Sequence, residues 1–94
     1  MEKAMDKVII TVVGQDTVGI IARVCTYLAD TRVNVLDISQ TIVSGYFNMM
    51  MIVDMAEANK DFAAVSEQLA ALGEEIGVSI KCQSEAIFQK MHRL

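Results

Sequence analysis

Four stretches of the chain carry the hydrophobic pattern of β-strands. Residues 7–13 are almost all β-branched and apolar on both faces, which predicts a central strand. Residues 33–43 alternate between apolar and polar from Leu36 onward, as a half-buried strand does. A return strand is expected over residues 46–55, and a fourth strand, again alternating, over residues 78–83. The pattern therefore predicts a sheet of four strands.

The dipeptide Ser44-Gly45 lies between the second and third of these strands and fits a two-residue hairpin turn. Counting back from that turn pairs the two strands residue by residue. We expect eight side chains to share the face that meets the helices, as the pairs Leu36 with Val53, Ile38 with Met51, Gln40 with Met49, and Ile42 with Phe47. A slip of one residue would turn Asp37 and Ser39 into the core, so the pattern specifies the register.

Two longer stretches have apolar residues at spacings of three and four, which predicts helices over residues 18–31 and 62–76. The apolar stripe of the first consists of Val18, Ile21, Val24, Cys25 and Leu28. That of the second consists of Phe62, Val65, Leu69, Leu72 and Ile76. The candidate caps of the second helix are Asn59 or Asp61 at its start and Gly73 or Gly77 at its end. A short final helix is expected over residues 84–94, with Ile87, Phe88, Met91 and Leu94 on its apolar side.

The order strand, helix, strand, strand, helix, strand is that of two strand–helix–strand units in tandem. It predicts an α+β fold, the ferredoxin-like βαββαβ sandwich, with a four-stranded antiparallel sheet and two helices on one face. We expect the first and third strands in the middle of the sheet. The globular domain is predicted over residues 7–84, with a flexible N-terminal tail at 1–6 and a C-terminal helical tail at 85–94.

The other face of this sheet is predicted to be open, with Ile9, Val13, Met50 and Ile52 exposed on it. An apolar patch of this kind usually marks an interaction surface. The final helix of the chain and a second copy of the protein are both candidates to cover it. An ordinary scatter of surface apolar residues is the alternative.

Composition narrows the classes of function. The chain of 94 residues fits one domain, and its formal charge of −4 disfavours nucleic acid as a partner. Its longest strongly apolar stretch, residues 49–53, is too short to span a membrane. Cys25 and Cys82 lack metal-ligand or redox spacing, so we expect reduced thiols in a cytoplasmic protein without metal or cofactor. Catalysis has little support, because His92 is the sole histidine and no nucleophile–base pair stands out.

The stretch from Gly14 to Ile20 joins the first strand to the first helix. A loop that opens a helix presents unpaired N–H groups and the positive end of the helix dipole, which suits a carboxylate or phosphate. Glycines at 14 and 19 allow unusual dihedrals or a close ligand approach, and Asp16 or Thr17 can cap the helix. The alternative is a well-capped turn with no ligand.

Two segments resemble the ACT domain, the small regulatory module of amino-acid metabolism. They are residues 11–22, which contain Asp16, Gly19 and Ile20, and residues 33–40, which begin Val33-Asn34-Val35. The resemblance covers about residues 7–84. More narrowly, the Asp-x-x-Gly-Ile loop and the segment Asp37-Ile38-Ser39-Gln40 are similar to stand-alone ACT proteins related to the glycine-cleavage regulator.

The resemblance implies a homodimer with an amino acid between the first loop of one subunit and the second-strand start of the other. The matching positions are Gly14, Asp16, Gly19 and Ile20 in the loop and Asn34 in the strand. The N–H groups of Gly19 and Ile20 would receive the ligand carboxylate, Asp16 its ammonium, and Asn34 either end. Asp16 is equally an N-cap candidate, and Asn34 a turn residue.

The function expected from these observations is that of a non-enzymatic regulatory module. It would bind an amino acid or similar metabolite at the dimer interface and signal to a separate partner protein. The alternative is a protein–protein assembly module with no metabolite ligand.

Overall fold

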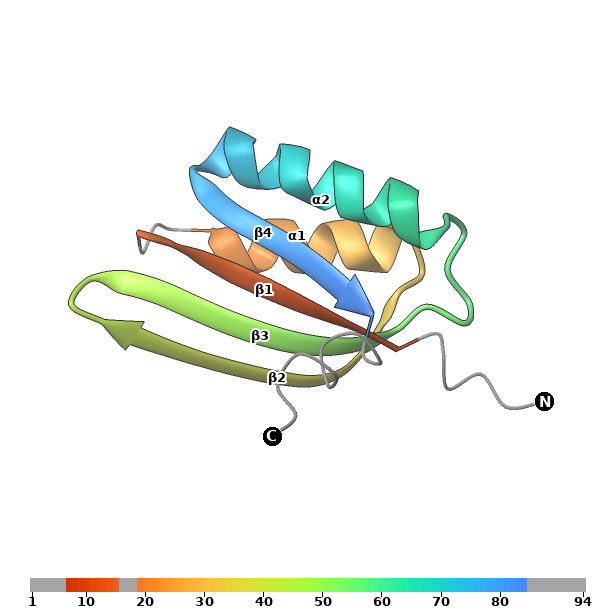
Figure 1. Ribbon diagram of the computed structural model, residues 1–94, viewed down its shortest axis with the longest axis horizontal. Coiled ribbons are helices and arrows are strands. Elements are labelled where there is room, and N and C mark those ends of the chain that lie inside the picture. Colours follow the sequence, from red (N-terminus) through yellow and green to blue (C-terminus); the bar gives the residue numbers. More distant parts are fainter. Residues whose placement is uncertain (1–6, 16–18, 85–94) are drawn as a thin grey trace.

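The computed structural model describes residues 7–15 and 19–84. Its elements follow the predicted order: β1 (Lys7–Gln15), α1 (Ile20–Asp30), β2 (Asn34–Val43), β3 (Tyr46–Asp54), α2 (Phe62–Ile76) and β4 (Val78–Ser84). The strands form one antiparallel sheet in the order β2-β3-β1-β4, with both helices on one face (Figure 1). The ferredoxin-like prediction is confirmed, with the first and third strands central. The predicted final helix at 84–94 lies beyond β4, outside the described residues except for Ser84.

The core lies between the sheet and the two helices. On β1, alternate residues Val8, Ile10 and Val12 face the helices, and their cross-strand neighbours on β3 are buried with them. These neighbours are Val53, Met51 and Met49, and the next buried residue along β3 is Phe47. The helices contribute Ile20, Val24, Leu28, Val65 and Leu69. Each fully buried side chain of this size stabilises the fold by about 1.5–3 kcal/mol before entropy is subtracted.

The local signals of the hairpin and the second helix are confirmed. Ser44 and Gly45 both have positive φ, 52° and 80°, as a two-residue hairpin turn of this hand requires. Asp61 caps α2, because its carboxylate accepts a hydrogen bond from the Ala64 N–H at 2.9 Å. Gly77 ends the helix in the left-handed conformation with φ 83°.

The first helix differs from the prediction by one position in its buried stripe. Ile20 is buried with Val24 and Leu28, whereas Ile21, expected in the core, is 37% exposed. The reason is that residues four apart share a helix face, and the sheet meets the face that begins at Ile20. Val18 lies outside the described residues.

The prediction for β2 was wrong in two respects. A β-bulge between Val35 and Asp37 places Val35, not Leu36, opposite Val53, although the other three predicted pairs are confirmed. All ten residues of β2 are exposed, so its helix-facing side chains are not core. The helices pack over β1, β3 and β4, and the edge strand β2 projects beyond them (Figure 1).

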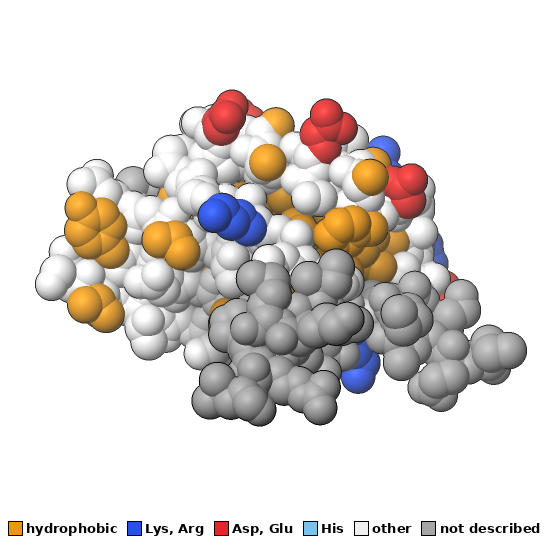
Figure 2. Space-filling model, viewed as in Figure 1, with side chains coloured by type: hydrophobic (Ala, Val, Ile, Leu, Met, Phe, Trp, Pro, Cys, Tyr) orange, Lys and Arg blue, Asp and Glu red, His pale blue; other side chains and the backbone are white. Residues whose placement is uncertain are grey.

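The exposed side chains of β2 continue around the hairpin. Ile42, Val43 and Tyr46 are more than half exposed. Figure 2 shows hydrophobic side chains at the left end of the molecule, where Figure 1 places the β2–β3 turn. On the open face, Val13 and Met50 are exposed as predicted, but Ile9, on a central strand, is buried and Ile52 is half-buried. The most exposed apolar side chains therefore lie around the β2–β3 turn rather than in the middle of the open face.

The two thiols are free, as expected, and both are half-buried beside the core. Burial raises the pKa of Cys82 from an ordinary value of 9.0 to about 11, and a hydrogen bond with Ser66 offsets part of that rise. Nearby, the Tyr27 hydroxyl on α1 donates to Oε1 of Gln68 on α2 at 2.6 Å. Burial and the Cys82 thiolate both raise the pKa of Tyr27. Cys82 is therefore a weak nucleophile at neutral pH.

Replacing Asp61 by alanine should lower the free energy of unfolding by about 1 kcal/mol, because the Ala64 N–H loses its capping partner. Urea denaturation measures this value. The Asp61→Asn variant keeps a capping oxygen and should lose clearly less stability. Equal losses in the two variants would show that the cap hydrogen bond is not the cause.

Cys82 should react slowly with iodoacetamide at pH 8 in the folded Cys25→Ser variant. Its rate should rise with pH to an apparent pKa near 11. Because the folded-state pKa is the higher one, the contribution of the neutral thiol to stability is complete below about pH 9 and is lost as the pH rises toward 11. A labelling curve that already levels off near pH 9, as in the urea-unfolded chain, would contradict this.

Candidate ligand-binding site

Gly14 is a strand residue and not part of the loop in which the prediction placed it. It pairs with Phe47 on one side and Val78 on the other. A Cβ at this position would lie 2.7 Å from Cγ1 and 2.9 Å from Cβ of Val78, closer than atoms can approach. The absence of a side chain is thus explained by packing between β1 and β4. A ligand contact of Gly14 stays a prediction.

The start of α1 provides the backbone half of the predicted site. Gly19 is the N-cap residue in a left-handed conformation, with φ 89°, which glycine adopts without strain. Its carbonyl accepts the Arg23 N–H at 2.9 Å and so closes the first helical turn. The first N–H groups of a helix have no partner within it, and they carry the positive end of the dipole. Asp16 lies outside the described residues.

Asn34 lies at the other end of α1, where β2 begins. It is exposed and lines a hollow of about 270 Å³ together with Ala29, Arg32, Val33 and Glu57. Arg32 is in the left-handed conformation, with φ 61°, in the short turn between α1 and β2. Glu57 comes from the loop between β3 and α2. The hollow is therefore made by two stretches of the chain, residues 29–34 and the loop that carries Glu57.

Arg32 and Glu57 were missing from the sequence prediction. Within the described part of the chain, neither has an ion-pair partner. A guanidinium can bind a carboxylate through two parallel hydrogen bonds, and a carboxylate accepts from an ammonium. Arg32 stands two positions before Asn34, so local spacing could have suggested it. Glu57 could not be found in this way, because only the fold brings its loop beside β2.

The two halves of the predicted site are apart within one chain. Gly19 precedes α1 and Asn34 follows it, and the helix between them has 11 residues. At 1.5 Å per residue this separates them by about 16 Å. A single copy therefore does not bring Gly19 and Ile20 to Asn34. An arrangement in which a second copy completes the site remains a prediction.

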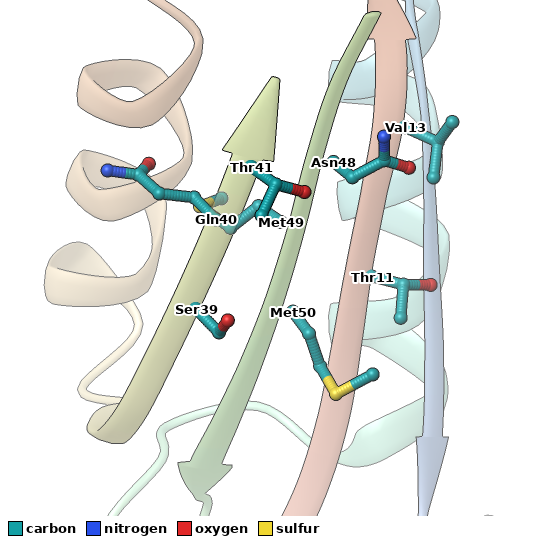
Figure 3. Close-up of a pocket in the computed structure, with 8 residues that line it drawn as sticks. All are labelled: Thr11, Val13, Ser39, Gln40, Thr41, Asn48, Met49 and Met50. Carbon is teal, nitrogen blue, oxygen red and sulfur yellow. The ribbon is translucent and has the colours of Figure 1, made fainter. Parts of the chain in front are cut away.

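A second hollow of about 190 Å³ lies on the open face of the sheet. Figure 3 shows Asn48 of β3 between Thr41 of β2 and Val13 of β1, while Gln40 extends away from them. The remaining lining residues are Thr11, Ser39, Met49 and Met50. Among the described residues that line this hollow none is charged, so these residues offer no group that would bind a carboxylate or an ammonium in an ion pair.

Two other kinds of site are absent from the described residues. They contain no group of three or more His, Cys, Asp or Glu side chains that could hold a metal ion. Their helices include none that is long and apolar enough to cross a membrane.

Comparison with known proteins identifies the family of this chain. The profile of a family described as the ACT domain matches residues 6–83. A UPF0237 protein of Bifidobacterium longum is 71% identical over 90 residues, covering 96% of this chain and 100% of that protein. A UPF0237 protein of Methanocaldococcus jannaschii is 46% identical with the same coverage.

Solved structures agree with this placement. An ACT domain protein from Streptococcus pneumoniae superposes with a TM-score of 0.78 at 42% identity, covering 88% of this chain and 93% of that one. A putative glycine cleavage system transcriptional repressor superposes with a TM-score of 0.73 at 22% identity, covering 82% of this chain and 44% of that one, which shows a shared fold alone. The chain belongs to the ACT domain family of ligand-binding regulatory modules, and its matched relatives include stand-alone proteins of nearly the same length.

Proposed function

We propose that this protein is a non-enzymatic cytoplasmic regulator that binds an amino acid where two copies meet and signals to a partner protein. The observation that carries the proposal is the hollow at the start of β2. It holds a cation, an anion and an amide, Arg32, Glu57 and Asn34, around one space of about 270 Å³. An amino acid zwitterion presents the two opposite charges that these groups complement.

Each end of the ligand would have a binding group from each copy. The carboxylate would lie between the Arg32 guanidinium of one copy and the N–H groups at Gly19 and Ile20 of the other. The ammonium would lie between Glu57 and Asp16 of the other copy. Asn34 can donate to the carboxylate or accept from the ammonium. The side chain of the ligand is left to point along the interface.

The direction of the elements supports this pairing. Only residues 31–33 separate α1 from β2, so the two elements run in opposite directions. At 1.5 Å per residue α1 is about 16 Å long, whereas β2 at about 3.3 Å per residue is about 33 Å long, so the start of α1 is level with the middle of β2. A two-fold axis across the β2 edge would run the two β2 strands in opposite directions and so turn Asn34 of one copy toward the start of α1 in the other.

Removing single polar side chains from the hollow should weaken ligand binding, whereas removing charges elsewhere on the surface should not. Calorimetric titration with each of the twenty standard amino acids should identify at least one ligand for the wild type. Asn34→Ala, Arg32→Gln and Glu57→Gln should each weaken that ligand by about tenfold or more, because each removes a charge-assisted or amide hydrogen bond. Lys81→Gln and Glu67→Gln are controls that remove one positive and one negative charge from exposed positions on β4 and α2, outside the proposed site.

If no amino acid produces heat with the wild type, the sensing half of the proposal is wrong. The protein would then be an assembly module that acts without a metabolite. Equal weakening by the control variants would show that net charge, and not the hollow, governs binding.

A change in the ligand tests whether Arg32 contacts the ligand carboxylate or only contributes to the net charge of the protein. The carboxamide analogue of the ligand should bind the wild type at least about tenfold more weakly than the amino acid does. In Arg32→Gln, replacing the amino acid by its carboxamide should weaken binding clearly less, because the ligand carboxylate has already lost its guanidinium partner. An unchanged difference between amino acid and carboxamide in the variant would remove Arg32 from the site.

A further inference from the structure

The open face of the sheet is arranged in rows that run across all four strands. The row nearest the end of β4, here the Ile9 row, consists from β2 to β4 of Asp37, Ile52, Ile9 and Gln83. The row at the other end, the Val13 row, consists of Thr41, Asn48, Val13 and Ser79. Both rows have the same backbone setting, so a difference in exposure between them depends on what covers each row.

Ile9 and Val13 differ in exposure although both stand on β1 and face away from the helices. Ile9 is 5% exposed, whereas Val13 is 45% exposed. Each has one cross-strand neighbour on β3 and one on β4, which flank the side chain without covering its tip. Among the described residues, Ile9 is the one buried apolar side chain that does not pack in the core between sheet and helices. The helices and the flanking strands therefore do not account for its burial.

Two segments outside the described residues adjoin this end of the face, because β1 begins at Lys7 and β4 ends at Ser84 on the same side of the sheet (Figure 1). Residues 1–6 include three charged side chains and are poorly suited to cover an isoleucine. Residues 85–94 instead carry apolar side chains at helical spacing, Ile87, Phe88, Met91 and Leu94. The chemistry of the second segment matches the apolar centre of the Ile9 row.

We propose that residues 85–94 of the same chain dock across the open face over Ile9 and Ile52, with their apolar side on the sheet. A path along the strands, toward Val13 and Met50, would cover those two side chains as well. They are 45% and 40% exposed, whereas Ile52 is half-buried. The segment would therefore cross the strands at the Ile9 row and leave the Val13 row open.

Length and charge both fit this crossing. As a helix, the nine steps from Ser84 to Arg93 would span about 14 Å. The distance from β4 to β2 is three strand spacings, which is also about 14 Å. Arg93 would then come level with Asp37, the acidic residue at the β2 end of the Ile9 row. The basic end of the segment would thus meet a carboxylate of opposite charge.

The docked segment would decide which surfaces a partner protein can reach. It would close the apolar end of the open face and leave accessible the hollow that is lined by Thr41, Asn48 and Val13. The inference goes beyond the proposed function, because it requires neither a ligand nor a second copy.

Thiol labelling of the full chain tests the cover over Ile9. In a Cys25→Ser, Cys82→Ser background, Ile9→Cys should react with iodoacetamide at least about tenfold more slowly than Val13→Cys, because only the first thiol is covered. Adding Phe88→Asp should raise the rate at Ile9→Cys by about tenfold or more, since a charge at the apolar contact disfavours docking. The rate at Val13→Cys should stay unchanged.

Matched controls separate the possible occupants. Met5→Asp places the same charge in the N-terminal segment and should leave the rate at Ile9→Cys unchanged. If Met5→Asp raises this rate and Phe88→Asp does not, residues 1–6 cover the face and the proposal is overturned. Protection that disappears on dilution would identify a second copy as the cover and overturn it equally.

The same labelling tests the direction of the segment. At low salt, Asp37→Asn should raise the rate at Ile9→Cys by about two- to fivefold, as expected for the loss of an exposed ion pair. Glu67→Gln, on α2, is the control and should have no effect. An unchanged rate in Asp37→Asn overturns the crossing toward β2.

A measurement on the unmodified chain does not depend on how well the variants fold. Nuclear Overhauser spectra should show contacts between the methyl groups of Ile9 and the ring of Phe88. In a mixture of labelled and unlabelled chains, these contacts should remain within one chain. Contacts that occur only between chains, or contacts of Ile9 with residues 1–6 instead, overturn the proposal.

Discussion

The packing of α1 and α2 on one face of the sheet is the constraint on which the rest of the structure depends. Each helix crosses over an inner strand to reach the next strand of its unit, so the helices cover β1, β3 and β4 and bury their apolar residues. The same crossing leaves β2 at the edge with every residue exposed. A strand rich in apolar residues and unpaired on one side is unfavourable in water unless something pairs with it.

The uncovered β2 edge bears directly on the proposed site, because a second copy that binds there would also contribute to the site. One chain separates the backbone N–H groups at the start of α1 from Asn34 by the length of the helix. Pairing through β2 would satisfy the edge and bring the separated halves together in one step. Ligand binding and dimerisation would then be linked, because a ligand that contacts both copies stabilises their association by mass action. A signal to a partner protein could follow from that linkage alone.

The related proteins contain this fold in chains of very different length. Proteins of nearly the same length match almost the whole of this chain, whereas several solved structures contain the fold as less than half of a longer chain. One fold therefore serves in different contexts, and function must be argued from the site. In this chain Arg32, Asn34 and Glu57 surround one hollow, with one positive and one negative charge that would complement the two ends of a zwitterion.

The sequence by itself determined the order of elements, the hairpin at Ser44-Gly45 and three of the four β2–β3 pairs, and it narrowed each cap of α2 to two candidates, because these depend on local geometry and periodicity. It also singled out Gly19, Ile20 and Asn34. Only the tertiary structure decided that Leu36 enters a bulge, that Gly14 makes room for Val78, and that β2 stays outside the core. Only the fold placed Glu57 beside Arg32 and Asn34, since contacts between distant segments depend on how helices cover the sheet and leave no periodic trace in the sequence.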